Sequence, residues 1–522
     1  MSSPEWRPGD AEYIASHGLE ASEVERQLAL LRDPPPPIRL VRNASRGDGV
    51  RVLTEHEKQA CLAAWRMTAS AGRWTSFVPA SGAASRMFKS LLAARSATRP
   101  VTLSTRAELA AAGDADAKEL VAFGQGLDRF AFREDLSRAL AARGATSARP
   151  GPDDELGPIL DALLDAEALD YASLPKGLIP FHAYPDGSRT AFEEHLVEAA
   201  GTVRDAGSTA RLHFTVSPQH RQAFEAELER LRPALRARLG VRYDVGFSEQ
   251  SPSTDTIAID AEGAPFRDGD GRLLFRPGGH GSLIGNVAAL GADLVYVKNV
   301  DNIVPDHRRA PCVEWKRITG GLLTVIERRI HSVLDDLDRG GPGAVQRAFH
   351  LLVTELGQEV PRALVENPGE EGARFARSKL DRPLRVCGVV RVTGDPGGGP
   401  FWCGEEGTAS LQIVETAQID LGERMQRAIF SASTHFNPVD LACSLHDRRG
   451  RPFDLRAHVD PATAFIAEKS SGGRALRALE HPGLWNGAMS DWSTVFVDVP
   501  VETFNPVKSV VDLLRPAHQP AA

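Results

Sequence analysis

Short strand-like segments alternate with helical segments through much of the chain, and this alternation limits the folds open to it. Strand-like residues 210–217 and 241–248 flank the helical pattern of residues 218–238. Further strand-like runs lie at 177–184, 292–304, 384–392, 410–419 and 493–500. Strands that alternate with helices favour an α/β fold with a mainly parallel sheet that helices cover on both faces.

Other stretches are predicted to be helical additions to this sheet. Residues 1–75 are polar and carry helical spacing, so we expect an N-terminal helical cap packed on the main body. A main domain would cover residues 76–515, with helical insertions at about 90–172 and 317–380. The Gly-rich residues 393–407 lie between two strand-like runs and open no helix, which predicts a hairpin loop rather than a phosphate loop.

Composition excludes several classes of protein. The 522 residues carry a formal net charge of −8 without long basic runs, which argues against nucleic-acid binding. No run approaches the length of a membrane span, and the first residues do not resemble a signal peptide, so we expect a cytoplasmic protein without a membrane partner. Five widely spaced cysteines fit reduced thiols better than disulfides or a zinc site.

The segment "VPASGAASRMFK" (78–89) has the pattern of a strand, a small-residue turn and a helix that opens near Ser85. Such a turn directs free backbone N–H groups at whatever lies above it, and a phosphate is the usual occupant. Arg86 and Lys89 would add positive charge there. The same pattern also occurs as a plain structural joint, so both interpretations remain open.

Two lysines stand beside prolines that stiffen the chain. Lys176 lies in "LPKGLIPF" (174–181), and Lys508 follows Pro506 in "VPVETFNPVKSVVDLL" (499–514). A lysine held in this way suits a positioned charge. The alternatives are a solvated turn lysine at 176 and an exposed lysine at the start of a helix at 508.

Two further segments carry polar groups. "YVKNVDNIVPD" (296–306) puts Asp301 at the carboxyl end of a strand, where α/β sheets build their sites and where oxygen ligands suit Mg²⁺. In "RPGGHGSL" (276–283), three glycines are predicted to leave room for a flat ligand beside His280. A simply exposed histidine is the alternative there.

These segments occur in the order of a known family. "PASGAASRM" (79–87) resembles its signature turn L-A-G-G-x-G-T-R-L, and "FSEQSP" (247–252) resembles its Phe-x-Gln-x-x-x-Pro segment. The family's other matching segments are "PKG" (175–177), "PGGHG" (277–281), "NVDN" (299–302) and "FNPVKSVVDLL" (504–514). The sequence thus resembles the UDP-glucose and UDP-N-acetylhexosamine pyrophosphorylases, and more closely a bacterial family that is a distant branch of that nucleotidyltransferase group.

The resemblance implies a GT-A-like (Rossmann-like) nucleotidyltransferase fold, with a mixed sheet and helical insertions. It implies transfer of a nucleoside monophosphate from a nucleoside triphosphate to a sugar phosphate or similar phosphorylated acceptor, with release of pyrophosphate and with Mg²⁺ as cofactor.

Residue roles follow from the same resemblance. Arg86, Lys176 and Lys508 would be the catalytic cations, at the β/γ end of the triphosphate, the α-phosphate, and the acceptor phosphate or pyrophosphate respectively. Asp301 and Asn437 would hold the metal, with His435 as an alternative to Asn437. Nucleotide-binding residues would be Ser81, Gly82, Ala83, Gln250, Gly279, His280 and Gly281.

The signature turn departs from the family at Ser81 and Ala84, where the family has glycine. These residues can follow the same backbone path only if both keep φ below zero. The departure motivates one alternative, a non-catalytic nucleotide-binding or regulatory protein on the same fold. A GT-A glycosyltransferase is the other alternative, although a donor diphosphate needs fewer cations than Arg86, Lys176 and Lys508 supply.

Overall fold

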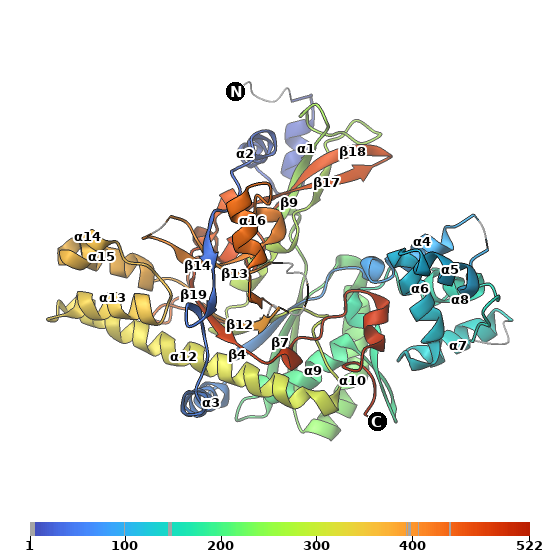
Figure 1. The fold of residues 1–522 in the computed structure, drawn as a ribbon, viewed down its shortest axis with the longest axis horizontal. Helices are drawn as coiled ribbons and strands as arrows, with labels where there is room; N and C mark the ends of the chain where they lie inside the picture. The colour runs from blue at the N-terminus through green and yellow to red at the C-terminus, as the bar shows by residue number, and fades with distance from the viewer. Residues whose placement is uncertain are drawn as a thin grey trace. The chain divides into compact units, whose positions relative to one another are not determined.

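A computed structural model describes residues 6–521, apart from residues 99, 145–148, 393, 395–397, 406 and 438–439. The chain divides into two compact units (Figure 1). Unit 1 contains the chain up to Thr75, Ser248–Val297 and Lys316–Val501, and unit 2 contains Ser76–Phe247, Lys298–Trp315 and the chain from Glu502. Within the described residues, no helix is both long enough and apolar enough to cross a membrane.

A mixed sheet forms the centre of unit 1. Its strands run in the order β2-β3-β19-β12-β16-β11. Val386 on β12 pairs with Val495 on β19 in parallel and with Ala442 on β16 in antiparallel orientation. The strands are β2 (Ser45–Arg46), β3 (Gly49–Arg51), β11 (Leu294–Lys298), β12 (Leu384–Arg391), β16 (Asp440–Ser444) and β19 (Ser493–Asp498). The sheet is mixed, because strand pairs of both orientations meet at β12, although β2–β3, β3–β19 and β12–β19 all pair in parallel.

Two smaller sheets and the short strand β15 (His435–Phe436), which pairs with β12 in antiparallel orientation, complete the described strands of unit 1. One has the order β1-β13-β14 and the other β10-β9-β18-β17. Their strands are β1 (Leu40–Asn43), β13 (Gly398–Cys403), β14 (Ser410–Glu415), β9 (Asp255–Ile259), β10 (Phe275–Pro277), β17 (Phe465–Ser471) and β18 (Arg474–Glu480). The hairpin-loop prediction for residues 393–407 is wrong in part, because β13 lies inside this stretch and pairs with β14 rather than leaving a bare loop.

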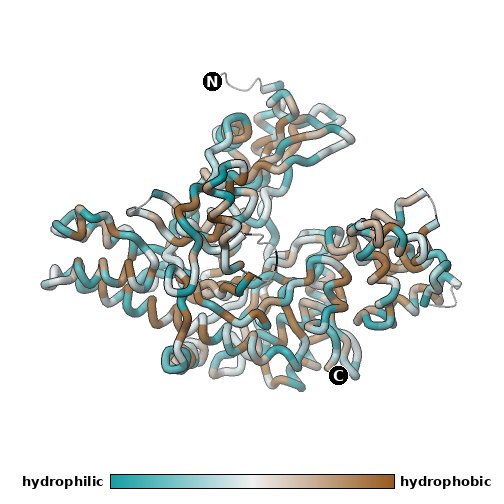
Figure 2. Tube along the Cα trace, viewed as in Figure 1, coloured by the Kyte–Doolittle hydropathy of each residue, from teal (hydrophilic) through white to brown (hydrophobic). Residues whose placement is uncertain are grey.

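The helices of unit 1 follow the sequence patterns. The N-terminal residues predicted as a helical cap contain three helices, and also the short strands β1 to β3. α2 packs on β9 and β18 through buried Val24, Leu28 and Leu31. The long helix α12 alternates hydrophobic and hydrophilic residues along its length (Figure 2). The helices are α1 (Asp10–Ser16), α2 (Ala21–Arg32), α3 (Glu55–Ser70), α11 (Ile284–Ala288), α12 (Arg309–Arg339), α13 (Ala344–Thr354), α14 (Arg362–Glu366), α15 (Gly369–Leu380) and α16 (Arg424–Ser431).

Unit 2 contains a second run of strands. They lie in the order β4-β7-β8, and β4 pairs with β7 in parallel, with Phe77 opposite His213. The strands are β4 (Trp74–Pro79), β7 (Thr209–Thr215), β8 (Arg242–Ser248) and the hairpin β5 (Pro180–Tyr184) with β6 (Gly187–Thr190). The helices α9 (Ala191–Thr202) and α10 (Arg221–Leu239) alternate with these strands, as the sequence predicts.

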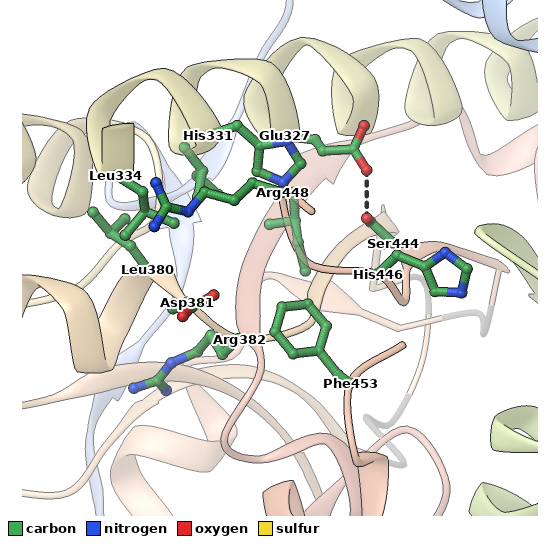
Figure 3. Close-up of a pocket in the computed structure, with 12 residues that line it drawn as sticks. Glu327, His331, Leu334, Leu380, Asp381, Arg382, Ser444, His446, Arg448 and Phe453 are labelled. Carbon is green, nitrogen blue, oxygen red and sulfur yellow. Dashed lines mark hydrogen bonds between the residues drawn. The ribbon is translucent and has the colours of Figure 1, made fainter. Parts of the chain in front are cut away.

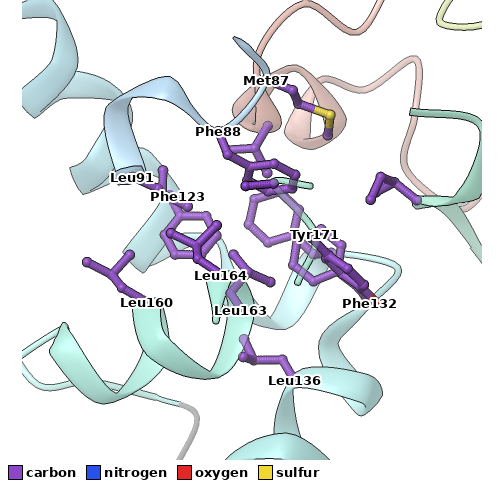
Figure 4. Close-up of a cluster of buried hydrophobic side chains, with 14 of the residues drawn as sticks. Met87, Phe88, Leu91, Phe123, Phe132, Leu136, Leu160, Leu163, Leu164 and Tyr171 are labelled. Carbon is purple, nitrogen blue, oxygen red and sulfur yellow. The ribbon is translucent and has the colours of Figure 1, made fainter. Parts of the chain in front are cut away.

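The helical stretch near residues 90–172 forms its own core within unit 2. Aromatic rings of Phe88, Phe123, Phe132 and Tyr171 meet at its centre (Figure 4). The helices are α4 (Lys89–Arg95), α5 (Leu103–Ala111), α6 (Ala115–Gln125), α7 (Arg133–Ala142) and α8 (Gly157–Leu164). The same core also contains Ile303, Val507, Val510 and Leu513. Apolar packing thus ties these helices to the segments that carry Asp301 and Lys508.

Candidate active site

Three segments far apart in sequence meet around the carboxylate of Asp301 in unit 2. Lys176 Nζ donates a hydrogen bond to Asp301 Oδ2 at 2.9 Å, and Lys508 Nζ donates to the same oxygen at 3.3 Å. Lys176 Nζ also donates to the carbonyl oxygen of Val507 at 2.8 Å. The structure therefore brings together three of the predicted site residues, one from each segment.

Backbone hydrogen bonds hold these segments in place. The N–H of Val507 donates to the carbonyl oxygen of Asp301 at 3.1 Å, and the N–H of Asn505 donates to Asn302 Oδ1 at 2.9 Å. Next to Lys508, the carboxylate of Asp512 accepts from the N–H groups of Lys508 and Ser509. The chain at Lys508 is therefore fixed independently of the lysine side chain.

The three charged side chains at this site differ in their exposure to solvent. The Asp301 side chain is 9% exposed, that of Lys176 15% and that of Lys508 65%. Burial raises the pKa of Asp301, but the ammonium groups of Lys508 and Lys176 outweigh burial and hold that pKa below its ordinary value. The second carboxylate oxygen, Oδ1, is buried and has no hydrogen-bond partner in the described part of the chain. This oxygen is available to a ligand.

The signature turn lies against the Pro-Lys-Gly segment. Ala84 N–H donates to the carbonyl oxygen of Leu174 at 2.8 Å, and Lys176 N–H donates to that of Gly82 at 3.4 Å. Gly177 has close contacts, since a methyl group there would lie 2.9 Å from the ring of Phe224. The turn, Lys176 and Asp301 thus form one continuous site.

The backbone of the turn offers free donors. No acceptor within residues 6–521, as far as these are described, binds the N–H groups of Ser81, Gly82 or Ala83. Arg86 is exposed and likewise has no hydrogen-bond or ion-pair partner among the described residues. Successive free N–H groups in a turn form a concave site for anions, and an adjacent guanidinium strengthens it.

Ser81 and Ala84 do not strain this turn. In the described chain, Asp170 and Ser208 are the non-glycine residues with positive φ, so Ser81 and Ala84 both keep φ below zero. The predicted helix start is less accurate. A single 3₁₀ turn, Ala84–Arg86, follows the small residues, and α4 begins at Lys89 rather than near Ser85. Phe88 adopts a non-helical conformation between the two, which separates them.

The predicted nucleoside residues belong to unit 1. Gln250 follows β8, and its Nε2 is buried without a hydrogen-bond partner in the described structure. The ring of His280 stacks on Trp485, with centroids 4.3 Å apart, and its Nδ1 accepts from the N–H of Leu484 at 3.0 Å. Nε2 of His280 lies 4.0 Å from Glu415 Oε1. His280 is therefore a packed residue and not simply an exposed one.

The glycines around His280 are required by packing. Gly279 has a φ of +78°, a conformation that favours glycine. A methyl group on Gly281 would lie 2.0 Å from the carbonyl oxygen of Pro482, and one on Gly278 would lie 2.5 Å from that of Thr254. The prediction that all three glycines leave room for a ligand is therefore wrong for Gly278 and Gly281, because neighbouring backbone already occupies that space.

Replacing Gly281 with alanine is expected to lower the stability of unit 1. Because the methyl group cannot coexist with Pro482, the turn must move, at a cost of about 1–3 kcal/mol for overpacking. Urea unfolding would measure the loss. Gly269→Ala is the matched control, since a methyl group there meets no atom within 4 Å. Equal midpoints for both variants would contradict this account of the turn.

Asn437 and His435 differ in what they can offer a metal ion. Both side-chain polar atoms of Asn437 are buried and lack hydrogen-bond partners among the described residues. His435 Nε2 instead lies 3.1 Å from Asp498 Oδ1, and its Nδ1 lies 2.8 Å from Thr434 Oγ1. Burial lowers the pKa of His435. Asn437 has the available oxygen, and it belongs to unit 1 whereas Asp301 belongs to unit 2.

Unit 1 contains two cavities that Asp301 does not line. One, between α12, β16 and the residues after α15, measures about 10 Å³, room for roughly one water (Figure 3). Ser444 Oγ donates there to Glu327 Oε1 at 2.5 Å. A larger one of about 460 Å³ is lined by residues that include Gly281, Ser282 and Arg456.

Among the described residues, no group of three or more His, Cys, Asp or Glu side chains could hold a metal ion.

The fold and the site define a mixed α/β protein in which a turn with free backbone N–H groups lies beside a buried carboxylate and two lysines. A family model described as "Domain of unknown function (DUF4301)" matches residues 8–519. The chain therefore belongs to this family. No curated protein matches the chain.

Several solved structures are similar to the chain at a low level. UDP-glucose phosphorylase from Trypanosoma brucei is 12% identical, with a TM-score of 0.44, over 97% of this chain and 77% of that one. UDP-N-acetylglucosamine pyrophosphorylase from the same organism, in complex with inhibitor, is 12% identical, with a TM-score of 0.44, over 94% and 74%. UDP-glucose pyrophosphorylase from Leishmania major is 11% identical, with a TM-score of 0.42, over 97% and 77%. At TM-scores below 0.5, these likenesses support no conclusion about fold or activity.

Proposed function

We propose that the protein is a nucleotidyltransferase on a GT-A-like fold, which transfers a nucleoside monophosphate from a nucleoside triphosphate to a phosphorylated acceptor such as a sugar phosphate. One observation carries the proposal. The free N–H groups of the turn at Ser81–Ala83 lie in one unit with the Lys176–Asp301–Lys508 cluster. Backbone hydrogen bonds from Ala84 to Leu174 and from Lys176 to Gly82 join the two. The order of the sequence motifs supports the same reaction.

The chemistry requires such a collection of charges. An oxygen of the acceptor phosphate attacks the α-phosphorus, the bond from that phosphorus to the bridging oxygen of the β-phosphate breaks, and pyrophosphate leaves with the electron pair. No covalent enzyme intermediate is needed, so positioning and electrostatic stabilisation supply the catalysis. Two polyanions must be brought together, and fixed cations with free N–H groups reduce their repulsion.

Each residue has a role in this proposal. The N–H groups at Ser81, Gly82 and Ala83 bind the triphosphate, and Arg86 binds its β/γ end. Lys176 stabilises charge on the α-phosphate, because its ammonium is held firmly by Asp301 and the Val507 carbonyl. Lys508 binds the acceptor phosphate or the pyrophosphate. Its side chain is 65% exposed, so it can reach a ligand that arrives from solvent.

The residues present fit a magnesium ion that is shared with the substrate. Mg²⁺ is usually held by one or two carboxylates together with substrate phosphates. Asp301 Oδ1 is a buried oxygen without a partner in the described structure, and the Asn437 amide oxygen is another. When bound, the ion would neutralise charge on the phosphates. We assign the metal to Asp301 on this basis, and Asn437, which belongs to unit 1, stays a ligand that the family resemblance predicts.

The residues that the family resemblance assigns to the nucleoside belong to unit 1. The Nε2 amide of Gln250 is a donor without a partner among the described residues, as a base-recognising group requires. The stacked rings of His280 and Trp485 and the backbone at Gly279 would border the same ligand. The chemistry of these groups suits any base with an acceptor at its edge.

A pyrophosphate-release assay tests the proposal. Four nucleoside triphosphates would be combined in turn with a panel of sugar 1-phosphates, in the presence of Mg²⁺. Pyrophosphate that appears only with particular pairs supports the proposal and identifies the substrates. Nucleotide binding without turnover on any pair would favour the non-catalytic alternative, and use of a nucleotide-sugar would favour the glycosyltransferase.

Lys508→Ala is expected to lower turnover of the productive pair by about a hundredfold, the scale for one preorganised electrostatic group. The melting temperature should change little, because the side chain is 65% exposed. Lys118→Ala, which removes an exposed lysine of α6, is the matched control and should keep wild-type rates. A Lys508→Ala enzyme as fast as the control would remove Lys508 from the site.

A further inference from the structure

The segment that carries Lys508, residues 502–521, has a buried histidine side chain near its end. We call these residues the Lys508 segment. His518 is 2% exposed, and its Nδ1 lies 3.0 Å from Nε2 of His182, which is 1% exposed. The two rings stack with centroids 5.3 Å apart and planes 12° apart. His518 is thus inserted into the interior of unit 2, ten residues after Lys508.

Hydrogen bonds and ion pairs hold the socket that receives His518. On the far side of His182, Nδ1 lies 2.8 Å from Glu194 Oε1, and the Glu194 side chain is wholly buried. Tyr184 Oη donates to the same oxygen at 2.6 Å, and Arg309 donates to Glu194 Oε2. Burial raises the pKa of Glu194, but His182, Arg309 and Tyr184 outweigh it and lower the pKa overall. His182 is therefore held in one orientation by an ionised carboxylate.

The Lys508 segment has further anchors. Val507, Val510 and Leu513 lie in the apolar core of unit 2, and the N–H of Val507 donates to the carbonyl oxygen of Asp301. After Leu513, the anchors are fewer. Gln519 Nε2 donates to the carbonyl oxygens of Leu513 and Arg129, and Arg129 donates to that of Leu514, but these contacts are exposed or half-buried. The backbone of Asn505 bonds to the His518 ring itself. Among the described side-chain hydrogen bonds made after Leu513, the histidine contact is the buried one, and it connects to the backbone three residues before Lys508.

We propose that His518 is a positioning residue for Lys508: its ring, bound by His182 in the buried socket, holds the Lys508 segment where the ammonium group reaches Asp301. The role of Lys508 in turnover rests on the proposed function. The anchoring itself does not, and it can be measured without any substrate.

Docking of His518 must depend on pH in a defined direction. A further proton on His518 places positive charge beside His182 in a buried site, which is unfavourable. Burial, then the charges of His182, Arg515 and Arg308, lower the pKa of His518 to about 3. The other charged groups around the socket are Glu194 and Asp306, each of which pairs with both Arg309 and Arg189.

This lowered pKa determines whether docking strengthens or weakens as the pH falls. An undocked His518 binds a proton below its ordinary pKa near 6.5, whereas the docked ring does not until about pH 3. Docking is therefore at full strength above pH 6.5. As the pH falls from 6.5 towards 3, the ratio of docked to undocked protein should fall by about tenfold per pH unit.

Hydrogen exchange of the full chain, read in peptides that cover residues 502–515, tests the proposal. The N–H groups of Val507 and Val510 report docking, because they donate to the carbonyl oxygens of Asp301 and Met87. In His518→Ala these amides should exchange at least about tenfold faster than in the wild type, since a buried hydrogen-bonded anchor is lost. His350→Ala, at an exposed position on α13, is the control and should leave them unchanged.

A second variant separates positioning from a general loss of structure. His518→Gln can still bond to His182 but does not titrate. It should restore most of the protection at pH 7.5, and it should lose the pH dependence that the wild type shows between pH 6.5 and 5 after correction for intrinsic exchange. Unchanged exchange in folded His518→Ala would overturn the proposal, as would the same pH slope in His518→Gln and the wild type.

Kinetics then connect the anchor to catalysis. With a productive substrate pair, His518→Ala should lower kcat by about tenfold or more with a small effect on the KM for nucleotide, and His518→Gln should restore most of kcat. If no pair is turned over by the wild type, the proposed function fails while the exchange data still decide the anchor. An exchange effect without any kinetic effect would leave His518 as an anchor that does not position Lys508, and would overturn that part.

Discussion

Asp301→Asn is expected to lower turnover by at least about a hundredfold, because it removes the charge at the centre of the site while keeping the shape of the side chain. The carboxylate holds Lys176 and Lys508 through one oxygen and presents the other to a ligand. An amide at this position can neither balance two ammonium groups nor offer a charged oxygen to Mg²⁺. Steady-state rates with the productive substrate pair would measure the effect.

The control for this variant is Asp165→Asn. Asp165 also lies between two cations, Arg95 at 3.0 Å and Arg143 at 2.9 Å, but it is 36% exposed and belongs to the helical part of unit 2. It should keep wild-type turnover and lose little stability, since exposed ion pairs contribute about 0–1 kcal/mol. If Asp301→Asn loses no more activity than this control, Asp301 is not part of the reaction.

Lys298→Met is expected to lower the free energy of unfolding by about 3–5 kcal/mol, the cost of removing one partner from a buried ion pair. Lys298 Nζ donates to Glu198 Oε2 at 2.7 Å, and the two side chains are 1% and 2% exposed. Without the lysine, the Glu198 carboxylate remains buried opposite an apolar side chain. Because Lys298 lies at the end of β11, three residues before Asp301, the loss would also loosen the site.

Two further variants distinguish this cost from other effects of the substitution. Lys58→Met removes a lysine that contacts Glu55 on the surface of α3, and it should change stability by about 0–1 kcal/mol. In Lys298→Met with Glu198→Met, both buried charges are gone, so most of the lost stability should return. Urea unfolding checks all of them. A single variant as stable as Lys58→Met would contradict the burial argument.

Local patterns in the sequence predicted most of the strands and helices. The runs at 210–217 and 241–248 form β7 and β8, and the pattern between them forms α10. Apolar periodicity reports burial along one element, so it is readable without knowledge of neighbouring elements. The same patterns did not reveal the mixed orientation of the sheet, because strand pairing depends on residues distant in the chain.

At the glycine turn 278–281, the type of residue does not by itself show why glycine is present. Glycine at 278 and 281 could indicate space for a ligand or a close approach of backbone, and the sequence does not separate the two. The structure does, since Thr254 and Pro482 occupy the space. The sequence also contains no pattern that predicts the burial of His518. A single histidine beyond the last motif has no pattern, and its partner His182 is far away in the chain.

The sequence by itself determined the candidate cations, the carboxylate and the turn, because a strand end, a proline-stiffened lysine and a run of small residues are local features. Only the tertiary structure decided that Lys176 and Lys508 share one oxygen of Asp301 and that His518 anchors the segment that carries Lys508. The physical reason is that these contacts join residues more than a hundred positions apart. Such contacts form when the core of unit 2 packs, and no local pattern encodes them.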